Sequence, residues 1–153
     1  MPITNLLVKA VMAGVMIAMG AAISNVAAHT ISDVGVARLA AAVVFPVGLM
    51  MVVLLGAELF TGDCLAVMSV FDGKQKIRSC LKLLVLVYIG NFVGAALTAL
   101  LISMSGQFDF SVGILGAYTI KVAVEKVNIS FADYNRQHNR RHIRHKRADV
   151  FSE

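Results

Sequence analysis

The sequence predicts an all-α integral membrane protein. Of the 153 residues, 58% are hydrophobic and only 15% are charged, and the mean hydropathy is +0.78. Soluble domains are closer to half apolar and a quarter charged. Long stretches are almost free of charge, as expected of helices that cross a bilayer. We therefore expect a multi-pass protein embedded in the lipid bilayer. Its transmembrane region should cover residues 1–132, followed by a separate tail at 133–153.

The first expected span covers residues 6–28 and carries a single charge, Lys9, near its start. Small residues recur along it at four-residue spacing: Ala10, Gly14, Ala18 and Ala22. Such a face allows another helix to approach closely, so these positions predict helix packing.

The second expected span, at about 36–71, is too long for one plain helix and contains an acidic octet. Residues 56–63 read GAELFTGD, which places Glu58 and Asp63 in an otherwise uncharged run. Glycine and threonine weaken helix continuity, so the span should break near 59–62. Inside a membrane, a helix can stop only where its freed backbone groups face protein or water.

Each polar residue of the octet has an expected role at this break. Thr61 should cap the second half-helix or contact a passing ion, since both uses suit a hydroxyl in a broken loop. Glu58 should brace the loop by accepting hydrogen bonds from the freed backbone, because a lone buried carboxylate is costly. Gly62 and Asp63 belong to the same bracing loop, with Asp63 directed into the bundle.

Basic residues predict the orientation of the chain. The loop before the third span is rich in them: Lys74, Lys76, Arg78 and Lys82. By the positive-inside rule this loop is cytoplasmic, and the amino terminus is cytoplasmic too. The third span, at about 81–105, has its own small-residue pair in Gly90 and Gly94, and a further helix should start within 114–132.

The segment 133–153 has a different character. It contains six Arg or Lys residues, three His and little apolar content, so we expect a disordered tail. The three histidines fall on one helical face, but the interleaved basic residues repel a cation, and we expect no metal site. The tail could hold anionic lipid or nucleic acid through charge alone, without specific nucleic-acid recognition.

An enzyme is not expected. The sequence has no nucleophile–base pair, no metal-ligand cluster in its spans and no phosphate-binding glycine loop, and it implies no cofactor. Cys64 and Cys80 lack metal-ligand spacing and are expected to be free packing residues.

GAELFTGD, followed by a basic loop and VYIGNFVGA, resembles the formate–nitrite transporter family, and KAVMAGVMIAMGAA is similar to that family's first span. The resemblance covers about residues 9–131. It implies an aquaporin-like helical bundle, of which this chain is the first inverted repeat with a broken second transmembrane helix. It also implies a homopentamer in the inner (plasma) membrane of a prokaryote, passing small monovalent anions such as formate, nitrite or hydrosulfide.

The resemblance also implies residue roles. Leu59, Phe60 and Thr61 would form the cytoplasmic-side constriction and gate, and Leu49 would belong to an outer hydrophobic constriction. Lys126 is similar to a lysine that attracts the anion near the start of the fourth span. Without the resemblance, Lys126 would be expected to extend to the membrane interface instead.

Only the amino-terminal half of the family pattern is present, since no match to the fourth span or the pore histidine follows. Three functions stay open. The first is transport of a small monovalent anion, with formate favoured over nitrite and hydrosulfide. The second is a truncated, nonconducting membrane protein, with the tail as a frameshift product. The third is a membrane-anchored basic tail that binds anionic partners.

Overall fold

The computed structural model describes residues 3–73 and 76–127, and every regular element in these ranges is helical. The predicted all-α membrane fold is confirmed. Within these described ranges, three helical stretches are long and apolar enough to cross a membrane: Ile3–Ala28, Val34–Leu54 and Ile77–Met104. The chain divides into one unit at residues 1–116 and a second that starts at Ala117. The predicted tail at 133–153 lies outside the described residues.

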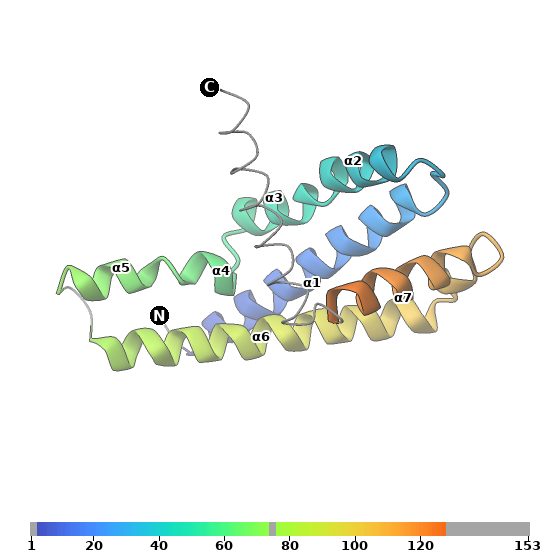
Figure 1. The fold of residues 1–153 in the computed structure, drawn as a ribbon. Coiled ribbons are helices and arrows are strands. Elements are labelled where there is room, and N and C mark those ends of the chain that lie inside the picture. Colours follow the sequence, from blue (N-terminus) through green and yellow to red (C-terminus); the bar gives the residue numbers. More distant parts are fainter. Residues whose placement is uncertain (1–2, 74–75, 128–153) are drawn as a thin grey trace, which may run out of the picture. The chain divides into compact units, whose positions relative to one another are not determined.

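Two long helices, α1 (Ile3–Ala28) and α6 (Ile77–Met104), lie side by side in the first unit (Figure 1). Their backbones come unusually close. A methyl group added at Gly94 would collide with the backbone of Val11, and one at Gly90 would lie 2.5 Å from the Cβ of Ala10. One at Gly14 would collide with the backbone of α6. Small residues therefore line this contact, which is how closely packed membrane helices associate.

The second span begins with α2 (Val34–Val44) and α3 (Pro46–Leu54), which lie along α1 (Figure 1). Asp33 caps α2, because its Oδ1 accepts a hydrogen bond from the Val36 N–H at 2.8 Å. The two helices are separated at Phe45 because Pro46 has no N–H to continue the hydrogen-bond ladder. Gly48 brings α3 against α1, since a methyl group there would lie 2.8 Å from the Met16 carbonyl oxygen.

After α3 the chain leaves the helix at residues 55–59, then forms α4 (Phe60–Asp63) and α5 (Ala66–Phe71). Both short helices lie along α6 (Figure 1). Gly56 has a φ of +58°, a left-handed conformation that glycine adopts without strain and that turns the chain out of α3. This interruption, residues 55–59, lies earlier than the loop expected near 59–62, and Thr61 falls inside the following helical turn.

Beyond α6, the chain continues through η1 (Gln107–Asp109) to α7 (Ile114–Val127). The connection between them is tied to the end of α1. His29 Nε2 lies 2.9 Å from Ser111 Oγ, and His29 Nδ1 lies 2.7 Å from the Val26 carbonyl oxygen. The ring of His29 also contacts that of Phe110, with centroids 6.1 Å apart.

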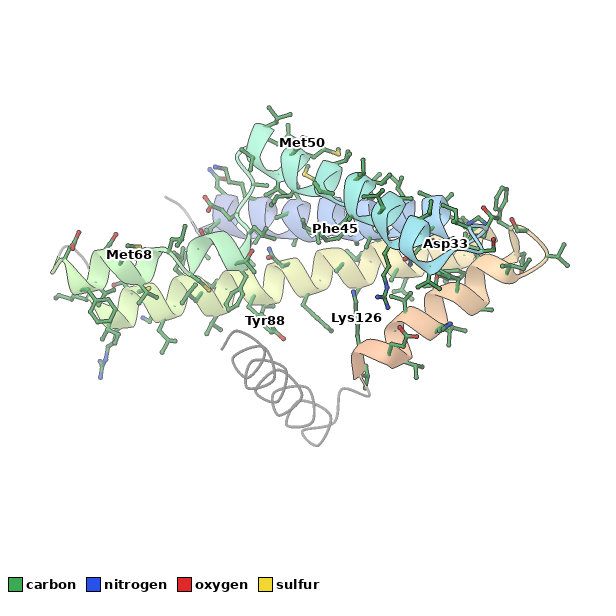
Figure 2. The ribbon with its side chains drawn as sticks, turned by 45° about the horizontal axis from the view of Figure 1, so that its top comes forward. Asp33, Phe45, Met50, Met68, Tyr88 and Lys126 are labelled. Atoms are coloured by element: carbon green, nitrogen blue, oxygen red, sulfur yellow. The ribbon has the colours of Figure 1, made fainter. Side chains whose placement is uncertain are left out.

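Large apolar side chains cover the outside of the helices (Figure 2). Met50 on α3 and Met68 on α5 are examples, and Leu54 and Phe71 are more than four-fifths exposed. Apolar surface this extensive is incompatible with water on all sides and is what lipid or further protein covers.

Candidate functional site

A pocket of about 350 Å³ lies beside the interruption of the second span. Its walls come from α3, the interruption and α4. Five residues singled out in the sequence line it together: Leu49, Glu58, Leu59, Gly62 and Asp63. The break thus brings two apolar side chains and two carboxylates to the same cavity.

The other three sequence-predicted residues do not line this pocket. Phe60 packs toward α6, where its ring meets that of Tyr88 nearly edge-on, with centroids 5.4 Å apart and planes at 71°. Thr61 is exposed on α4. Lys126 lies exposed in the last turn of α7, in the unit that starts at Ala117 (Figure 2).

The backbone of the interruption is held by a side chain that the sequence analysis did not single out. Asn91 Oδ1 accepts a hydrogen bond from the Phe60 N–H at 2.9 Å. Asn91 Nδ2 donates to the carbonyl oxygens of Glu58 at 3.0 Å and Ala10 at 2.8 Å. In the sequence, the glycines of the segment at 90–94 predict close helix packing and give no role to the asparagine between them. A carboxamide in an apolar span, which must find hydrogen-bond partners, was the available signal.

The expected N-cap at Thr61 is wrong. Leu59 occupies that position in an extended conformation, with φ −109° and ψ 128°, and its side chain makes no capping bond. Thr61 lies two residues further along, inside α4, so its hydroxyl is not needed to start the helix. The first N–H of α4 is capped from α6 by Asn91 instead.

One charged group of the octet, the carboxylate of Glu58, comes close to a lysine of α1. Lys9 Nζ lies 4.0 Å from Glu58 Oε1, with the two side chains 39% and 28% exposed. A carboxylate in a membrane span is normally paired, and Lys9, the single charge of the first expected span, supplies the partner. Asp63 Oδ2 is buried and has no hydrogen-bond partner among the described residues.

Metal coordination finds no support around this pocket. In the part of the chain that the structure describes, no three His, Cys, Asp or Glu side chains are grouped to hold a metal ion. Cys64 is an exposed free thiol and Cys80 a buried one.

A family model described as formate/nitrite transporter matches residues 1–134 of the chain. The chain belongs to the formate/nitrite transporter family. The resemblance noted in the sequence is thereby confirmed, and so is the expectation that the chain is not an enzyme, because the formate/nitrite transporter family consists of transporters and channels.

Individual relatives agree with this membership of the formate/nitrite transporter family. The chain is 34% identical over 94 residues to the formate channel FocA of Haemophilus influenzae, covering 61% of this chain and 33% of that protein. It is 33% identical over 132 residues to the formate-nitrite transporter of Plasmodium falciparum, covering 80% and 40%. It is 34% identical over 142 residues to the uncharacterized transporter YrhG of Bacillus subtilis, covering 86% and 50%. The chain spans between a third and a half of the length of these relatives.

Proposed function

We propose that this chain forms part of a pore through which a small monovalent anion crosses the membrane. Formate is the favoured anion, with nitrite and hydrosulfide as further candidates. The observation that carries the proposal is the interruption of the second span, with a pocket beside it, in a chain of this family. Broken membrane helices are where transport proteins place their substrate paths.

The proposed path uses apolar constrictions and a polar gate. Leu49 and Leu59, which line the same pocket, form apolar walls at which the anion loses water. Passage there is cheaper for the neutral acid than for the bare anion. Thr61, exposed on α4, offers its hydroxyl to the anion on the cytoplasmic side, and Phe60 restricts the path with it. Lys126 attracts the anion by its charge.

The proposed setting follows the family resemblance. We place the chain in the plasma membrane of a prokaryote with its amino terminus in the cytoplasm. The assembly is a homopentamer of aquaporin-like protomers. Glu58, Gly62 and Asp63 brace the region between α3 and α4, with Lys9 as the counter-ion of Glu58.

Anion flux into liposomes tests the proposal. The purified chain is reconstituted, its insertion is verified, and uptake of labelled formate is compared with that of empty vesicles. Thr61→Val removes the hydroxyl and keeps the shape, so flux should fall about tenfold if one hydrogen bond to the anion is lost. Thr61→Ser keeps the hydroxyl and should retain most of the flux.

Two results would count against this function. An inserted wild-type chain whose formate uptake equals that of empty vesicles would refute transport by this chain. Equal flux through the wild-type and Thr61→Val chains would remove Thr61 from the gate.

A further inference from the structure

The interruption of the second span leaves two backbone groups next to the start of α4 without their helical partners. In a continuous helix the Phe60 N–H would bond to the Gly56 carbonyl, and the Glu58 carbonyl would accept from the Gly62 N–H. Neither bond is formed, because the residues directly before α4 are not helical and Leu59 is extended. Unpaired backbone groups are especially costly where no water reaches them, so both need substitutes.

The carboxamide of Asn91 supplies both substitutes. Its oxygen accepts from the Phe60 N–H, and its nitrogen donates to the Glu58 carbonyl. The second hydrogen of the same nitrogen goes to the carbonyl of Ala10 on α1. Two acceptors thus face the nitrogen and one donor faces the oxygen, which fixes the orientation of the amide. A primary carboxamide carries this combination of donors and acceptor, and a hydroxyl or a carboxylate does not.

Close helix packing keeps Asn91 at this place. A methyl group at Gly14 would collide with the backbone carbonyl of Asn91, so α1 lies directly against it. Gly90 and Gly94, which flank Asn91 in the sequence, allow α1 and α6 to approach closely there too. The Lys9–Glu58 ion pair connects the interruption to α1 one residue before Ala10. The amide therefore lies between α1, the interruption and the start of α4, and the close approach of α1 to the Asn91 backbone keeps α1 within its reach.

We propose that Asn91 is the positioning residue of the interrupted span: its side-chain amide replaces two missing peptide hydrogen bonds and fixes residues 58–60, where the interruption enters α4, between α1 and α6. It does not line the pocket and acts on it through the backbone of Glu58 and Phe60. The effect on anion flux rests on the proposed function. The effect on the backbone does not.

Hydrogen exchange at the Phe60 amide tests the inference directly. The chain is labelled with ¹⁵N-phenylalanine in lipid nanodiscs, and the Phe60 signal is identified by its loss in Phe60→Leu. Asn91→Leu keeps the side-chain size and removes all three bonds, so this amide should exchange about tenfold faster or more. Thr98→Val is the matched control, since Thr98 is buried in the same helix and bonds only within it, to the Gly94 carbonyl at 2.9 Å. It should leave Phe60 unchanged.

Asn91→Asp covers the case in which Asn91→Leu fails to insert. Aspartate keeps an oxygen for the Phe60 amide but no donor for the two carbonyls, so the exchange rate should lie between those of wild type and Asn91→Leu. The inference is overturned if Phe60 exchanges equally fast in all three chains. It is equally overturned if Thr98→Val accelerates Phe60 as much as Asn91→Leu does.

Flux measured on the same samples separates this inference from the proposed function. If the wild-type chain passes formate, Asn91→Leu should reduce the formate flux about tenfold, in parallel with the faster hydrogen exchange at the Phe60 amide. Equal flux despite the lost protection would overturn the link from Asn91 to transport. If the wild-type chain passes no anion, the proposed function fails, and the exchange rates alone decide the role of Asn91.

Discussion

Two glycines near the interruption of the second span differ in backbone conformation although both have free space around them. Gly56 has a φ of +58°, whereas Gly62 lies inside the helical turn of α4. A Cβ added at either position would meet no atom within 4 Å. The effect of a methyl group at each site therefore reports on the backbone alone.

We expect Gly56→Ala to destabilise the chain by about 1–2 kcal/mol, because a side chain disfavours the left-handed region. Gly62→Ala should be neutral or stabilising by up to about 1 kcal/mol, because alanine favours a helix over glycine. Denaturant unfolding in a mild detergent, followed by circular dichroism, measures both. Equal losses from the two substitutions would show that the turn at Gly56 does not depend on its backbone conformation.

Residue patterns singled out side chains that line one pocket but did not identify the side chains that contact them. The octet GAELFTGD and the family resemblance pointed to Leu49, Glu58 and Leu59, which share one pocket. Asn91 and Lys9 were missed as partners because their contacts cross between helices. Which residues of α1 and α6 face the break depends on the register of their packing, and local sequence does not determine it.

At the scale of elements, the contact between α1 and α6 organises the first unit. Gly94 lies where the two backbones meet, so a methyl group has no flexible side chain to displace and must push helices apart. Overpacking of this kind usually costs about 1–3 kcal/mol.

Gly94→Ala should therefore lower the unfolding free energy by about 2 kcal/mol despite the better helix propensity of alanine. Leu97→Ala is the comparison on the same helix, because Leu97 is half exposed and its truncation removes contacts without creating a collision. The destabilisation by Gly94→Ala should be the larger of the two in detergent unfolding. The opposite order would mean that α1 and α6 pack less closely than described.

The helices themselves were easier to predict than the position of the break. Uninterrupted apolar sequence located α1 and α6 within a few residues of their ends. The break was expected near 59–62 on helix propensity, but residues 60–62 are helical, and the chain turns at Gly56 instead. Propensity is a weak guide where a side chain of another helix satisfies the freed backbone groups, as Asn91 does here.

At the scale of the whole molecule, the distribution of charge gives a testable orientation. Lys76, Arg78 and Lys82 lie at the start of α6, while no Lys or Arg occurs near its end at Met104. By the positive-inside rule the start of α6 faces the cytoplasm.

Single cysteines at the two ends of α6 test this orientation. In a chain without Cys64 and Cys80, Ser79→Cys and Ser105→Cys are nearly isosteric and lie at exposed positions. A membrane-impermeant thiol reagent added to intact cells should label Ser105→Cys and spare Ser79→Cys, and both should react after the membrane is opened. The cysteine-free chain gives the background. Labelling of Ser79→Cys alone in intact cells would place the basic loop outside.

The ring contact between Phe60 and Tyr88 has a consequence for motion. Tyr88 and Asn91 are three residues apart, about one turn of α6, and both hold the same residue of α4. A displacement of α4 that moves the Phe60 ring away from Tyr88 also stretches the hydrogen bond from the Phe60 N–H to Asn91 Oδ1, so we expect the two contacts to be lost together.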